Sequence, residues 1–167
     1  DCDGIADEVQ DWKEIFRAEA GNGLANDQLG SSVAIDGDWA LMGAPGAGIA
    51  YLLKRNDNDP SEWDFVKEFN NGTNYNQDLF GSSVSLHNGI AVVGAPHDNS
   101  RGNHAGAVHI FVQNPVDALE WSALKTIYAS DPTDAANFGK SLKIKGQTLM
   151  VGATGASSAY VFSQNAG

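Results

Sequence analysis

The sequence predicts an all-β protein built from three repeating four-stranded units, and two observations lead to this prediction. First, one segment occurs three times, with its leading glycine at Gly30, Gly81 and Gly139. A second set of glycines and a set of tryptophans keep the same two spacings: Gly43, Gly94, Gly152, Trp12, Trp63 and Trp121. Second, each copy contains short runs in which small or polar residues alternate with large apolar ones, as in half-buried strands. A period of about fifty residues is typical of repeated structural units.

The first two strands of each unit form a predicted hairpin. In the first copy they cover 32–35 and 39–42, and the turn between them contains Gly37. Gly89 and Gly146 stand at the same place in the later copies. A tight two-residue turn needs a residue that adopts a positive φ, which glycine does readily. The common feature is therefore a backbone conformation.

Two further strands complete each unit. The third strands are predicted over 48–54, 106–112 and 158–163. The fourth strands begin at the repeated tryptophans and cover 12–16, 63–67 and 121–125. This gives about twelve short strands and no clear helix, a pattern that fits the four-stranded blades of a β-propeller.

We expect two regions along the chain. Residues 1–11 form an acidic N-terminal segment, and residues 12–167 form a single domain. The repeats within this domain cover about 12–55, 63–114 and 121–165. The second copy has extra residues over 96–105, which we interpret as a long surface loop because loops tolerate insertions.

The composition excludes some classes of function. The formal net charge is −11, with 21 acidic residues against 10 Lys and Arg, which disfavours binding to nucleic acid. No apolar run approaches the roughly 20 residues that a membrane helix needs. We see no secretory leader, so any signal peptide was removed or never included. Cys2 is the only cysteine, so it either pairs with another chain or stays unpaired.

The repeated motifs resemble a known family. The units LGSSVAI…MGAP…AYLL, FGSSVSL…VGAP…VHIF and FGKSLKI…VGAT…AYVF closely resemble FG-GAP repeats, which form the propellers of integrin α-subunits and occur in many secreted proteins. The tryptophan strand resembles the secreted subtype. The resemblance implies propeller-type blades, an extracellular, secreted or cell-surface location, and a role in binding or assembly.

Calcium is treated separately, because many integrin-type repeats carry an acidic calcium loop between the second and third strands. The matching stretches here contain only one acidic residue, Asp98, so this loop is not carried over. The N-terminal residues Asp1, Asp3 and Asp7 resemble part of a thrombospondin type 3 or EF-hand-like loop. We keep two interpretations of them, a partial calcium site and a solvated acidic tail.

The fourth strand of the third unit is missing, and a spare strand of that type opens the domain. It comprises Trp12, Lys13, Glu14, Ile15, Phe16 and Arg17. The chain is a fragment of a larger propeller, or this segment closes the third unit of its own chain, or it pairs with a neighbouring copy. We favour pairing between copies, because the chain holds equal numbers of all four strand types in permuted order.

The long loop of the second copy supplies the candidate binding residues. These are His97, Asp98, Arg101 and His104, which we expect to contact a glycan or a protein. His97 and His104 also suggest a surface metal site, although their spacing is not that of a regular ligand set. Trp39 has no tryptophan at the equivalent positions, so we expect it to make a surface contact. The repeated tryptophans either pack between strands, which we favour, or form a sugar-stacking platform.

One modification site and one absence complete the prediction. Asn71 begins an Asn-Gly-Thr sequon, where N-glycosylation is one outcome and an unoccupied loop the other. No nucleophile elbow, phosphate-binding loop or recurring carboxylate pair is present, so we expect no enzyme activity. The predicted function is that of an extracellular structural protein that self-associates by strand exchange into an oligomer or filament. The alternative is an adhesion or lectin-like binding module.

Overall fold

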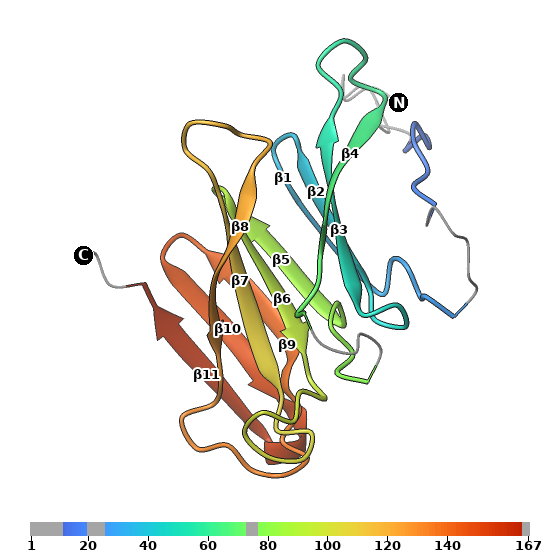
Figure 1. The fold of residues 1–167 in the computed structure, drawn as a ribbon. Helices are drawn as coiled ribbons and strands as arrows, with labels where there is room; N and C mark the ends of the chain where they lie inside the picture. The colour runs from blue at the N-terminus through green and yellow to red at the C-terminus, as the bar shows by residue number, and fades with distance from the viewer. Residues whose placement is uncertain (1–11, 20–25, 73–76, 165–167) are drawn as a thin grey trace, which may run out of the picture.

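The computed structural model describes residues 12–19, 26–72 and 77–164 and contains strands, turns and one short 3-10 helix (Figure 1). The elements are β1 (Ser32–Asp36), β2 (Trp39–Ala44), β3 (Ile49–Arg55), β4 (Trp63–Phe69), β5 (Ser83–His87), β6 (Ile90–Ala95), β7 (Ala107–Gln113), β8 (Trp121–Ile127), β9 (Phe138–Lys145), β10 (Thr148–Ala153), η1 (Thr154–Ala156) and β11 (Ser158–Ser163). The predicted all-β class is confirmed.

The strands form three antiparallel sheets, one for each repeat. The first has the order β1-β2-β3-β4, the second β5-β6-β7-β8 and the third β9-β10-β11. The hairpin predicted at Gly37 is present: Asp36 lies opposite Trp39, and Gly37 has a φ of +58°. The first and second sheets also share a register shift in the pairing of the third strand with the fourth, at Leu52/Leu53 and at Ile110/Phe111. The two four-stranded sheets are therefore structural copies of each other.

The three sheets are stacked in chain order (Figure 1). The contacts between neighbouring sheets involve chiefly their first strands, β1, β5 and β9. A core between the first and second sheets contains Leu41, Leu52, Phe69, Val84, Leu86, Val93, Phe111 and Trp121. A core between the second and third sheets contains Val92, Val108, Phe138, Ile144, Leu149 and Val151. Within the described ranges the stack does not close into a ring.

The repeated glycines mark the points where adjacent sheets approach most closely. A Cβ atom on Gly43 would collide with the carbonyl oxygen of Gly81, and one on Gly94 with that of Gly139. Gly81 and Gly139 have φ values of +95° and +89°, a region that favours glycine. The second glycine of one sheet and the first glycine of the next sheet are thus needed together.

Serine side chains add hydrogen bonds between the sheets. The backbone N–H of Val84 donates to Ser32 Oγ at 2.9 Å, and that of Ile144 donates to Ser85 Oγ at 3.2 Å. The hydroxyl of Ser83 donates to the carbonyl oxygen of Gly139 at 2.6 Å. These serines belong to the scaffold, as their place in the repeat indicates.

The strand predicted at 12–17 is not formed in this single chain. Residues 12–19 have no strand assignment, and none of the described pairings joins them to β11. A β-strand requires hydrogen bonds with the backbone of a partner strand. Residues 12–19 lie beside the first sheet, whereas β11 belongs to the third sheet, at the other end of the stack (Figure 1). Residues 12–17 therefore form no strand within the isolated chain, and their pairing with the third unit stays a prediction.

Candidate functional site

Two sheet faces, at the ends of the stack, are not packed against another sheet. Cross-strand partners lie on one face of a sheet, and on the first sheet such a face contains Val33, Ile35, Met42, Tyr51 and Phe65, here called the first-sheet outer face. Val33 and Ile35 are 66% and 64% exposed. On the third sheet the uncovered face contains Lys143, Met150 and Val161, here called the third-sheet outer face.

In the second and third sheets, the face equivalent to the first-sheet outer face is buried. Val84 and Val93 occupy the repeat positions of Val33 and Met42 in the second sheet, and both are buried against the first sheet. Val151 occupies the position of Met42 in the third sheet and is buried against the second. In each covered case the preceding sheet supplies the cover. The first-sheet outer face therefore has the composition of a packing surface.

The third sheet also has an open edge. In the first two sheets the third strand pairs with a fourth strand, as β3 does with β4 and β7 with β8. In the third sheet β11 pairs only with β10 among the described residues. An unpaired edge presents a row of backbone N–H and C=O groups that can accept another strand.

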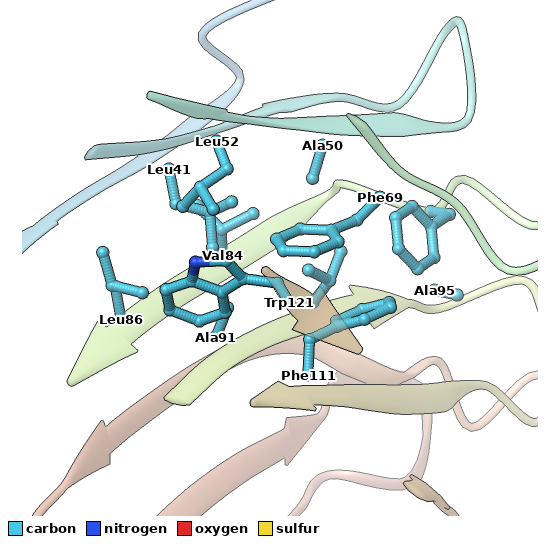
Figure 2. Close-up of a cluster of buried hydrophobic side chains, with 12 residues drawn as sticks. Leu41, Ala50, Leu52, Phe69, Val84, Leu86, Ala91, Ala95, Phe111 and Trp121 are labelled. Carbon is cyan, nitrogen blue, oxygen red and sulfur yellow. The ribbon is translucent and has the colours of Figure 1, made fainter. Parts of the chain in front are cut away.

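An apolar groove of about 360 Å³ lies between the second and third sheets, next to this open edge. Its lining includes Ile90, Ile110, Lys125, Ile127, Leu149 and Phe162. The equivalent space between the first two sheets is filled by Trp121, which Figure 2 shows within the core. Its ring packs edge-on against Trp39, with ring centroids 5.4 Å apart. The ring of Phe69 also lies edge-on to that of Trp121, with ring centroids 6.1 Å apart.

The N-terminal segment lies at the opposite end of the stack. Phe16 and Ala18 are half-buried and border a small depression on the first-sheet outer face with Met42 and Tyr51. Arg17 forms an exposed ion pair with Glu14 at 3.1 Å. Trp12, in contrast, is fully exposed (102%), so its apolar ring is not packed against the rest of the chain.

The long loop of the second unit is a brace between sheets. The rings of His97 and His104 stack in parallel at 4.2 Å, and burial lowers the pKa of His97 below its usual value, with the charge of His104 as a second cause. Asp98 is buried and accepts a hydrogen bond from the N–H of Ser100 at 2.8 Å. Arg101 lies over the ring of Tyr128 at 5.1 Å. The loop brings His97 and His104 together, whereas Asp98 and Arg101 contact other residues.

Backbone bonds connect this loop to the segment that leads into β9. The N–H of Ala135 donates to the carbonyl of Asn103 at 2.7 Å, and that of Asn137 donates to the carbonyl of His104 at 3.0 Å. The described residues contain no group of three or more His, Cys, Asp or Glu that could hold a metal ion. The backbone contacts give the loop a structural role that the sequence did not reveal.

Two other predicted sites have a mixed outcome. Asn71 is half-buried, and its side-chain amide donates to Asp78 Oδ2 at 2.8 Å, so the nitrogen that would carry a glycan is engaged within the protein. The third residue of the sequon, at position 73, lies outside the described residues. Asp1, Asp3 and Asp7 also lie outside them, and the calcium interpretation stays a prediction.

Trp39, predicted to make a surface contact, is also part of the packing between sheets, and the surface contact stays a prediction. Its ring is half-buried and packs against the core between the first and second sheets. The reason is its contact with Trp121, which comes from a different repeat. Packing, the favoured role for the repeated tryptophans, is confirmed for Trp121, whereas Trp63 is half-buried beneath the guanidinium of Arg55, 4.6 Å from the ring centroid.

Stacked antiparallel sheets, two of four strands and one of three among the described residues, repeat one another in sequence and define a blade-type repeat protein. The model of the FG-GAP repeat matches residues 12–59 and 74–111, and the chain belongs to the FG-GAP repeat family. Such repeats typically occur in extracellular or cell-surface proteins, among them integrin-like adhesion proteins. A comparison with curated proteins gave no match. In the described part of the chain, no helix has the length and apolar character to cross a membrane.

Proposed function

We propose that this protein is a non-catalytic, extracellular structural protein that self-associates head to tail. In this arrangement the third-sheet outer face of one copy packs on the first-sheet outer face of the next copy. Residues 12–17 of that next copy then pair with β11. The observation that carries the proposal is the third sheet, in which β11 has no fourth-strand partner among the described residues, while residues 12–17 repeat the sequence of β4 and β8.

The glycine contacts between sheets support the same arrangement. Gly81 and Gly139 each approach the backbone of the preceding sheet, whereas a Cβ on Gly30 would meet no atom within 4 Å. Gly43 and Gly94 each meet the next sheet, whereas Gly152 meets only Ser141 of its own sheet. Each end of the stack therefore carries one half of the contact that joins adjacent sheets.

The charges at the hairpin tips are also complementary. Between the first two sheets, Asp36 Oδ1 lies 3.7 Å from Nδ1 of His87, the residue at the same repeat position in the second sheet. The residue at this position in the third sheet is Lys145. When the third sheet of one copy takes the place that precedes the first sheet of another, Lys145 approaches Asp36, an attractive pair of opposite charges.

The test is the size of the particle formed by the whole 167-residue chain. Sedimentation velocity over increasing protein concentration should show species larger than the monomer. A variant that lacks residues 1–18 should sediment as a monomer, because it has no strand to donate. Its circular dichroism spectrum provides the folding control. A full-length chain that stays monomeric at high concentration contradicts the proposal.

A further inference from the structure

We infer that the groove between the second and third sheets is a receptor for the indole ring of Trp12 from a second copy of the chain. This inference rests on the proposed self-association and assigns its anchoring contact. The occupied groove between the first and second sheets provides the template, because the fourth-strand tryptophan of the second sheet fills it.

The template contact is well packed. Trp121 is 2% exposed, and its ring contacts those of Trp39 and Phe69. Figure 2 shows Trp121 and Phe69 in the same core. The Nζ atom of Lys67 donates to the backbone carbonyl of Trp121 at 2.7 Å and so joins the fourth strands of the two sheets. A buried aromatic ring of this kind removes a large apolar area from water.

The empty groove repeats this site position by position. Ile90, Ile127 and Lys125 occupy the places of Trp39, Phe69 and Lys67 in the following unit, and all three line the groove. The two isoleucines are smaller than the residues they replace, so the walls leave room for a large ring. Within the part of the chain that the structure describes, the second site lacks the tryptophan of a fourth strand in the third sheet.

Trp12 fits this vacancy for two reasons. It stands in phase with Trp63 and Trp121 and is followed by five further residues of the predicted strand. It is also fully exposed in the single chain, although a tryptophan usually contributes most when it is buried. Its own chain cannot easily place it there, because residues 16–19 border the first sheet.

The register of the occupied site predicts that of the new one. Trp121 lies opposite Gln113, and Ser122 lies opposite Val112. Gln164 and Ser163 hold the same repeat positions as Gln113 and Val112. Trp12 should therefore lie opposite Gln164 of the second copy, with Lys13 opposite Ser163 and Lys125 below the carbonyl of Trp12.

The first test compares two variants of exposed residues by sedimentation equilibrium. Trp12→Ala should weaken self-association at least about tenfold, because a buried aromatic anchor dominates an interface of this kind. Val116→Ala is the matched control, since Val116 is equally exposed and lies in the loop between β7 and β8. Association of Trp12→Ala that equals that of the wild type overturns the inference and leaves the proposed function standing.

The second test is a disulfide between copies in a Cys2→Ser background. A chain that carries Lys13→Cys and Ser163→Cys should form cross-linked dimers and higher species under oxidation, because directly opposite residues lie within disulfide range. Glu14→Cys with Ser163→Cys is the control, since a shift of one residue points the side chain to the other face. Equal cross-linking in both variants overturns the predicted register. A wild-type chain that never associates removes both the proposed function and this inference.

Discussion

At the residue scale, the glycines of the repeat act in pairs across sheet boundaries. Gly43 is needed because Gly81 approaches it, and Gly94 because Gly139 does. The sequence shows that these glycines recur but does not show their partners, which come from the neighbouring unit. The requirement for each of these glycines therefore comes from a neighbouring unit of the repeat.

The substitution Gly94→Ala tests this pairing. Its Cβ would collide with the backbone carbonyl of Gly139, so we expect the free energy of unfolding to fall by about 3 kcal/mol. In Gly152→Ala the new atom meets only the hydroxyl of Ser141, which can rotate away, so the loss should be much smaller. Urea denaturation of both variants measures the difference. Equal losses contradict the account.

His109 makes stability depend on pH. Burial lowers the pKa of this histidine below its ordinary value of 6.5. As the pH falls below about 6.5, the unfolded chain binds the proton before the folded chain does, so the free energy of unfolding decreases. Above that pH both states are neutral at this residue and the contribution is constant. His97, whose pKa is also lowered, acts in the same direction.

The variant His109→Tyr should weaken this pH dependence. Tyrosine occupies the same position in the other sheets, as Tyr51 and Tyr160. The ring of Tyr160 contacts Phe138 edge-on at 5.3 Å, the distance between the rings of His109 and Phe80. The fall in the free energy of unfolding between pH 8 and pH 5.5 should be smaller for the variant than for the wild type. An unchanged fall shows that His109 is not its source.

At the element scale, adjacent sheets are joined by hydrogen bonds as well as by apolar contact. Ser85→Ala leaves the buried N–H of Ile144 without its side-chain acceptor, so we expect a loss of about 1–3 kcal/mol in the free energy of unfolding. Ser31→Ala is the control, because that exposed hydroxyl bonds only to Gln28 of its own turn. Chemical denaturation that gives the same small loss for both variants counts against a contribution from this bond.

The strands and hairpins could be predicted because their determinants are local. Alternating side chains and a turn glycine predicted the hairpin β1–β2 with nearly correct bounds and placed the turns of the hairpins β5–β6 and β9–β10. The segment 12–17 has the same local pattern, yet it forms no strand in the single chain. Its pairing depends on a neighbour, which local sequence does not specify. Pattern alone therefore predicts the capacity to form a strand.

The candidate site was only partly predictable, because its contacts join different repeats. The sequence drew attention to Trp12 and to the open third unit. It gave Trp39 a surface role, whereas Trp39 packs on a tryptophan of the second unit. The groove was missed, although the equivalence of Lys67 with Lys125 and of Trp39 with Ile90 was a signal that could have located it. The bracing role of residues 96–105 likewise rests on contacts with the third unit.

At the scale of the whole molecule, the stack has two unlike ends. The first-sheet outer face is apolar, whereas the third-sheet outer face adds Lys143 and borders an incomplete sheet. Contact between unlike surfaces of identical chains is heterologous, and it yields either a closed ring or an open filament, depending on the rotation between copies. Head-to-tail assembly therefore depends on the difference between the two ends of the stack.

This polarity can be tested by mixing two variants that are each blocked at one end. Ile35→Lys places a charge on the first-sheet outer face, and Met150→Lys places one on the third-sheet outer face; both residues are exposed, so the fold should persist. Each variant alone should sediment as a monomer. An equimolar mixture should form one-to-one dimers, because each partner contributes the end that the other has lost. A mixture that stays monomeric, or single variants that associate as the wild type does, would contradict head-to-tail assembly.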